Sequence, residues 1–194
     1  RLRDHPVDDV AFDRERLEWV NGQWIRRLSD TDLASRLLPF LADSIAGRLA
    51  DGVPGRLPTE EDVTALLPMV RERLPVLGAV GSLVDFVFLD DVRADAALLV
   101  PKRWDVATTI EGLAAARAVI AGAGAVSFEA DELEPVLRAL ADARGWKAGD
   151  LFSAIRVATT GRTATPPLFD TLVAIGQERV VARLDAAIAV LTGG

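Results

Sequence analysis

The stretch LFSAIRVATTGRTATPPLF, residues 151–169, predicts where one helix ends and the next begins. Gly161 suits the left-handed backbone conformation in which many helices end. Thr165 is a good N-cap residue, and Pro166 stands where a first helical turn tolerates proline. We therefore predict a helix up to about residue 160, a polar turn, and a second helix from residue 166. The stretch carries Arg156 and Arg162 and no acidic residue.

The rest of the chain also has helical periodicity. Acid-rich segments at 29–32 and 59–62 are typical of capped helix starts. Asn21-Gly22 predicts a kink or a turn within the first helix. No alternating run of five or more residues indicates a strand, so we predict an all-α fold. The expected helices cover residues 13–28, 30–50, 60–77, 82–89, 106–121, 129–144, 148–160, 166–175 and 177–191.

Breaks in this pattern fall at residues 51–58, 99–102 and 121–125, which are rich in glycine or proline. The GAG sequence in the last of them lacks the preceding strand and the third glycine of a dinucleotide fingerprint. We expect a short N-terminal part followed by two helical subdomains, with boundaries at residues 1–28, 29–105 and 106–194.

Composition excludes several classes of site. The 194 residues include no cysteine and one histidine, His5, so disulfides, thiolate metal sites and His/Cys clusters are excluded. Glu60-Glu61-Asp62 is typical of a helix start rather than of a metal site, and no metal site is expected. No apolar run reaches eighteen residues, so we expect no membrane partner. The absence of cysteine suits a cytoplasmic location. Because the chain begins with Arg1 and has only Met69, we expect a piece of a longer protein.

The charge is acidic overall but uneven. Twenty-two basic and 29 acidic residues give a net charge of −7, whereas most nucleic-acid-binding proteins are basic. Residues 151–169 nevertheless carry two arginines and no acid. Electrostatic interactions fall off within about 10 Å at ordinary salt, so a local cationic surface is compatible with a negative total.

Several motifs in chain order resemble the C-terminal anticodon-binding region of bacterial glutamyl-tRNA synthetases. An arginine before TGRT, followed by TPPLF at residues 165–169, is similar to that region. So are VAFD with LEWVNGQWIRRL in residues 10–28, LPFL at 38–41, LLVPK at 98–102 and QERV at 177–180. Together these matches extend over essentially the whole chain.

The resemblance implies an all-α, two-subdomain helical cage that recognises a tRNA anticodon loop. Residues 1–28 would be the remnant of the stem-contact region that joins the catalytic body. The parent would be a glutamate–tRNA ligase whose catalytic half uses ATP and magnesium. This chain lacks HIGH-type and KMSKS-type signatures, so we expect it to bind no cofactor and to be inactive alone. Its expected partners are glutamate tRNA and its own catalytic domain, and it is expected to be a monomer.

The same resemblance indicates site residues. It places base or phosphate contacts on Arg73, Arg156, Arg162, Thr165, Pro166 and Leu168. Pro166 and Leu168 would offer apolar surface to an unstacked base, and Arg162 would meet a phosphate. A small alignment shift would exchange Arg73 for Arg71. A planar guanidinium suits the work because it can bond a base edge or stack on a base.

Other interpretations remain open from the sequence. Arg156 and Arg162 are also placed to bond helix-end carbonyls. Trp19, Trp24, Trp104 and Trp146 are expected to pack in or beside the core, although a missing catalytic body would leave Trp19, Trp24 and Ile25 more exposed. His5 is expected at the surface, and Asp90-Asp91 in a solvated turn. The alternative function is an acidic, all-helical protein-interaction scaffold. A stand-alone enzyme is disfavoured because no catalytic cluster is present.

Overall fold

The computed structural model describes residues 14–122 and 128–193 of the chain. Across these residues the fold is all-α, as predicted, and an isolated bridge between Gly55 and Leu89 is the β-type pairing that the described residues contain. The predicted helix start at Asp13, and His5, lie outside the described residues.

The first group of helices extends to residue 88. It comprises α1 (Arg14–Arg27), α2 (Asp30–Ala50), α3 (Glu60–Val70), α4 (Val80–Val84) and three 3-10 turns, η1 (Arg71–Arg73), η2 (Leu77–Ala79) and η3 (Asp85–Phe88). α2 packs against α3, α4 and η3, and α1 contacts η1. Ser29 and Thr59 accept hydrogen bonds from the backbone of the helices that they begin, so both predicted caps are confirmed.

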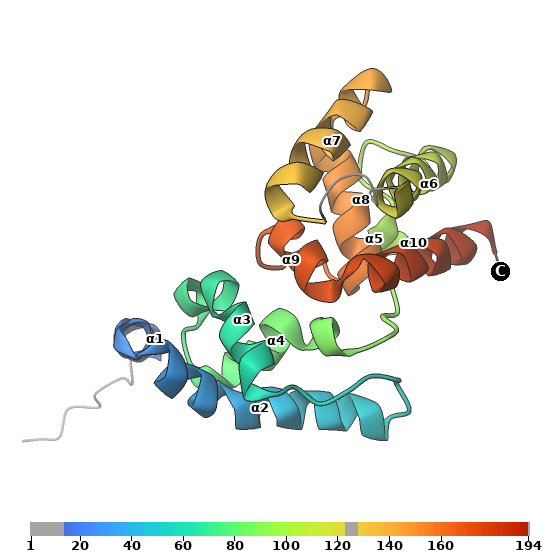
Figure 1. Cartoon of the computed structure of the whole chain (residues 1–194). Coiled ribbons are helices and arrows are strands. Elements are labelled where there is room, and N and C mark those ends of the chain that lie inside the picture. Colours follow the sequence, from blue (N-terminus) through green and yellow to red (C-terminus); the bar gives the residue numbers. More distant parts are fainter. Residues whose placement is uncertain (1–13, 123–127, 194) are drawn as a thin grey trace, which may run out of the picture.

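The second group contains α5 (Ala96–Leu99), α6 (Val106–Gly122), α7 (Ala130–Ala143), α8 (Ala148–Thr160), α9 (Leu168–Ile175) and α10 (Gln177–Thr192). Figure 1 shows it standing over the first group, with α9 next to the region of α3 and α4. The short helix α5 was not predicted, and it packs against α8 and α10. The predicted subdomain boundaries stay a prediction.

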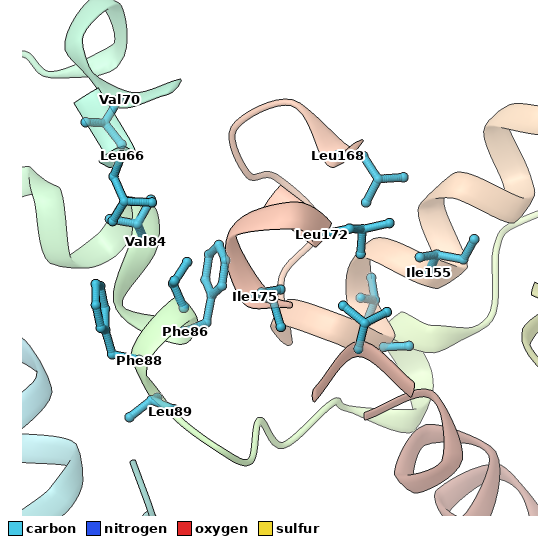
Figure 2. Close-up of a cluster of buried hydrophobic side chains, with 14 of the residues drawn as sticks. Leu66, Val70, Val84, Phe86, Phe88, Leu89, Ile155, Leu168, Leu172 and Ile175 are labelled. Atoms are coloured by element: carbon cyan, nitrogen blue, oxygen red, sulfur yellow. The ribbon is translucent and has the colours of Figure 1, made fainter. Parts of the chain in front are cut away.

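One hydrophobic core continues through both groups. In Figure 2, Phe86 of η3 stands beside Ile175 of α9, while Phe88 lies further toward the first group. Both phenylalanine side chains are buried. The turn η3 therefore carries the core across the junction of the two groups.

The structure differs from three predictions in the first group. α1 continues through Asn21-Gly22 without a break, and Gly22 is buried near the Leu74 carbonyl. The helix predicted over 60–77 ends at Val70. Pro75 explains the early stop, since the residue before a proline is pushed out of the helical region, and Leu74 has an extended backbone. The helix predicted over 82–89 is instead divided between α4 and η3.

The opening motif is confirmed at its first helix end and wrong at the next helix start. Gly161 ends α8 in the left-handed conformation, with φ +70°. α9 begins at Leu168, and Pro167, not Thr165, is its N-cap residue. The physical reason is that Thr165 and Pro166 each precede a proline, which disfavours helical backbone at both positions.

The tryptophans divide into two pairs. Trp104 and Trp146 are half-buried with ring centroids 5.3 Å apart, as the packing interpretation predicted. Trp19 and Trp24 are 65% and 63% exposed, so the packing interpretation is wrong for them and the expected exposure of this surface is found at both. Ile25, next to Trp24 in the chain, is buried, contrary to the expectation of greater exposure. The helix therefore buries one face and leaves both indoles outside the core.

Candidate nucleic-acid interface

A groove of about 480 Å³ lies between the two groups of helices. Its walls include α3 and Arg73 from the first group, and Pro167 and Asp170 from the start of α9. Phe88 of η3 also lines it. The groove thus brings one predicted site residue, Arg73, next to the TPP segment (residues 165–167), which contains two others.

Arg73 and Arg71 have different surroundings, although they are two residues apart. Arg71 donates to the carbonyl oxygen of Leu28 at 2.6 Å and pairs with Asp30, which ties it to the junction of α1 and α2. Arg73 is exposed, and within the described residues its guanidinium has no hydrogen-bond or ion-pair partner. Of the two, Arg73 is therefore the one whose side chain is available at the groove.

Arg156 lies beside Thr165, as the sequence predicted. Its Nε donates to Thr165 Oγ1 at 3.2 Å, and Thr165 Oγ1 donates to the Pro166 carbonyl at 2.8 Å. Arg156 is partly buried, and that burial lowers the pKa of its guanidinium. The structure gives Arg156 this side-chain partner in the TPP segment rather than a helix-end carbonyl.

Arg162 is held at the junction of the two groups. It donates to Asp85 Oδ1 and to the Ser82 carbonyl, both at 2.6 Å, and its guanidinium lies 5.1 Å from the Phe86 ring centroid. Asp85 is buried. The Arg162 guanidinium, which was expected to meet a phosphate, is therefore bonded within the protein and has a structural role.

Pro166 and Leu168 do not offer the expected apolar surface. Both residues are buried, and Leu168 is 4% exposed. Figure 2 shows Leu168 close to Leu172 of α9 within the core cluster. The reason is that Leu168 lies on the side of α9 that packs into the core, whereas Asp170, in the same turn, is exposed.

Three further arginines at the junction were missed by sequence reasoning. Arg56 pairs with Asp62 through two hydrogen bonds of 2.6 and 2.7 Å, and it lies 5.2 Å from the Phe88 ring centroid. Hydrogen bonds from Arg56 hold the pKa of the Asp62 carboxyl well below its usual range. Arg179 and Arg183 of α10 are four residues apart, and therefore share a helix face that the sequence could have revealed.

Both α10 arginines reach carbonyls of η3 and its next residue. Arg179 donates to the Val87 carbonyl at 2.6 Å, and Arg183 donates to those of Phe86 and Leu89. Burial is the main reason that the pKa of Arg179 is lowered and that the pKa of Arg183 falls to about 10. Arg183 nevertheless remains charged at neutral pH.

The sequence of the chain was compared with models of known protein families, and one of them matches. A model of the anticodon-binding domain family matches residues 32–188. The chain belongs to this family. The matched range includes Arg73, Arg156 and the Gly161 turn, and it begins after α1. The family assignment therefore extends over both groups of helices and the groove between them.

Relatives of the chain are glutamate–tRNA ligases. The one from Roseiflexus sp. (strain RS-1) is 45% identical over 186 residues, which is 94% of this chain and 35% of that ligase. The one from Chloroflexus aurantiacus is 40% identical over 185 residues, 94% of this chain and 36% of that ligase. The chain thus spans about a third of the length of these relatives.

Solved structures show the same fold. The crystal structure of a glutamate tRNA ligase from Elizabethkingia meningosepticum gives a TM-score of 0.63 at 20% identity, covering 93% of this chain and 33% of that one. The glutamate–tRNA synthetase from Elizabethkingia anophelis gives 0.64 at 20% identity, covering 91% and 32%. These likenesses support the all-α fold.

Two other kinds of site are absent from the described parts of the family domain. Residues 14–122 and 128–193 contain no group of three or more His, Cys, Asp or Glu side chains placed to share a metal ion. Within the same residues, no helix combines the length and the apolar character needed to cross a membrane.

Proposed function

We propose that this chain binds the anticodon loop of a glutamate-accepting tRNA, as the RNA-recognition part of a glutamate–tRNA ligase. The observation that carries the proposal is the groove lined by both Arg73 and Pro167 of the TPP segment, within a match to the anticodon-binding domain family. Neither that match nor the relatives named above favour the alternative of a protein-interaction scaffold.

The chemistry of the groove supports RNA recognition. Anticodon bases are splayed out of the helix, so their edges and faces are accessible to side chains. The guanidinium of Arg73, unpaired within the described residues, can bond or stack on such a base. Arg156 with Thr165 provides a second polar position, in the segment that leads to the groove-lining Pro167. We propose Arg73, Arg156 and Thr165 as the RNA contacts.

Electrostatics favour a local rather than a general attraction to RNA. The chain is acidic overall, and the groove is lined by three arginines, Arg56, Arg73 and Arg179, together with three acidic residues, Asp62, Glu129 and Asp170. Asp62 balances Arg56 through its ion pair, whereas Arg73 has no such partner among the described residues. Arg179 donates to the Val87 carbonyl, so Arg73 is the groove arginine that neither an ion pair nor a carbonyl engages among the described residues.

Binding of an in vitro transcript of glutamate tRNA, followed by fluorescence anisotropy, tests the proposal. We expect a measurable affinity whose logarithm falls linearly with the logarithm of salt concentration. A transcript with a substituted anticodon should bind more weakly than the unaltered one. Equal binding of both transcripts, or no binding at low salt, would contradict anticodon recognition.

We further propose that the chain acts as a cytoplasmic monomer, and that ATP and magnesium are bound outside it. The absence of cysteine supports a reducing compartment, and the absence of both ATP-binding signatures supports an inactive chain. ATP–pyrophosphate exchange with glutamate should therefore be undetectable with this chain alone. Sedimentation at several protein concentrations should give one constant mass.

A further inference from the structure

Arg183 of α10 bonds both groups of helices from inside the core. It is 2% exposed. Its Nη2 donates to the carbonyls of Phe86 and Leu89, and its Nη1 donates to the carbonyl of Thr159 near the end of α8. Its Nε has no hydrogen-bond partner within the described residues.

Each end of this contact leads to a proposed RNA-binding side chain. Thr159 lies about one helical turn after Arg156 on α8, so a hydrogen bond to the Thr159 carbonyl fixes the helix that carries Arg156. On the other side, the Phe88 carbonyl, between Phe86 and Leu89, accepts from the Arg56 backbone N–H at 2.9 Å. Arg56 belongs to the loop that leads into α3 and, after it, to Arg73.

The energetics favour a positional role over a purely stabilising one. Burying a guanidinium costs free energy that well-packed apolar residues would avoid, and among the described residues no carboxylate bonds it to offset the cost. What the guanidinium provides instead is direction, because its planar fork fixes the angles of several N–H donors at once. A flexible apolar side chain would fill the same space without fixing those angles.

We propose that Arg183 is a positioning residue for RNA recognition, which sets the spacing between Arg73, at the groove, and Arg156, on α8, without itself touching RNA. The inference rests on the proposed function for its RNA component. The spacing can be measured in the absence of RNA, so the role of Arg183 in positioning and the proposed RNA binding can fail separately.

The spacing test uses spin labels on the full chain. The sequence contains no cysteine, so Ala46→Cys and Ala186→Cys introduce the only thiols, at exposed positions on α2 and α10. The distance distribution between these labels should be narrow. In Arg183→Met it should broaden or shift, while Arg183→Lys, which retains the charge but not the fork, should give an intermediate result.

Arg117→Met is the matched control. Arg117 of α6 pairs at 2.9 Å with Asp185, which lies on α10 as Arg183 does. Both partners belong to the second group of helices. Loss of Arg117 removes an arginine contact without touching η3. The label distances and the RNA affinity should therefore stay at the values of the unsubstituted chain.

The second part of the test is the affinity of each variant for the glutamate tRNA transcript, measured at fixed salt concentration and low temperature. We expect Arg183→Met to weaken binding about tenfold, because the RNA contacts would remain but would be displaced. The affinity of Arg183→Lys should lie between those of Arg183→Met and the unsubstituted chain. Unchanged label distances, or a changed distance with unchanged affinity, would overturn the proposal. Loss of helical circular dichroism in both Arg183 variants would also overturn it, because Arg183 would then be needed for folding itself. Failure of the unsubstituted chain to bind would instead refute the proposed function.

Discussion

The Nε of Arg156 and the hydroxyl of Thr165 lie 3.2 Å apart, which ties the last turns of α8 to the loop before α9. The same hydroxyl donates to the Pro166 carbonyl, so Arg156 is oriented by the TPP segment itself. A partly buried arginine held in this way keeps donors free for another molecule, since Nε supplies one of its five N–H groups.

Replacement of Arg156 tests this arrangement. Arg156→Ala should weaken binding of the glutamate tRNA transcript by about 1–3 kcal/mol if the guanidinium makes a bidentate base contact. Circular dichroism should show an unchanged fold. Equal loss on a transcript with a substituted anticodon would indicate a phosphate contact, and no loss on either would remove Arg156 from the site.

Arg73 and Arg71 form a matched pair. Arg73→Ala should weaken RNA binding and leave the free energy of unfolding unchanged, because its side chain is exposed. Arg71→Ala should instead lower the free energy of unfolding by about 1–3 kcal/mol, since the Leu28 carbonyl would lose its donor. Urea denaturation and anisotropy on both variants check this. The reverse pattern would mean that the two arginines exchange roles.

Arg162→Ala should mainly affect stability. Removing the guanidinium leaves the buried Asp85 carboxylate without its partner, so we expect the free energy of unfolding to fall by about 3 kcal/mol. Asp85→Asn in the Arg162→Ala background should recover part of that loss. If Arg162→Ala kept its stability but lost RNA affinity, the expected phosphate contact would be supported instead.

Gly161 and Gly149 provide a test of the turn that ends α8. Gly161 has φ +70°, and a Cβ there would lie 3.1 Å from the Arg93 carbonyl oxygen, so Gly161→Ala should cost about 1–2 kcal/mol. Gly149, within α8, has open space where an added methyl group would stand, and Gly149→Ala should add about 0.5 kcal/mol. Thermal unfolding of both variants measures these changes in stability. Equal changes for Gly161→Ala and Gly149→Ala would contradict a role for the left-handed conformation of Gly161.

Asp62 makes stability depend on acid pH. Its pKa is lowered in the folded chain, chiefly by hydrogen bonds from Arg56, so the folded state binds its proton less readily than the unfolded state. The resulting stability is present above about pH 4, the ordinary aspartate value, and decreases as the pH falls below it. Asp62→Asn should be less stable at pH 7 by about 1 kcal/mol, and the difference from the unsubstituted chain should shrink at about pH 3. A constant difference across this range would contradict the assignment.

Local sequence signals predicted the elements better than their ends. The helix over 30–50 and those from 106 onward were found from periodicity, and Ser29, Thr59 and Gly161 act through neighbours within four residues. The errors at 70–77 and 166–168 come from prolines whose effect on the preceding residue was not applied. That effect is itself local, so better use of the sequence would have corrected both.

The sequence by itself determined that this chain is all-α, where most of its longer helices lie, and which motifs relate it to the anticodon-binding family. Those properties depend on spacing and on contacts within a turn of helix. Only the tertiary structure decided which arginines remain available: Arg162 is occupied by Asp85, 77 residues away, and Arg71 by Leu28, 43 residues away, whereas Arg73 is free at the groove among the described residues. The reason is that a guanidinium takes whichever acceptor folding brings within hydrogen-bond reach, and no spacing along the chain encodes that neighbour.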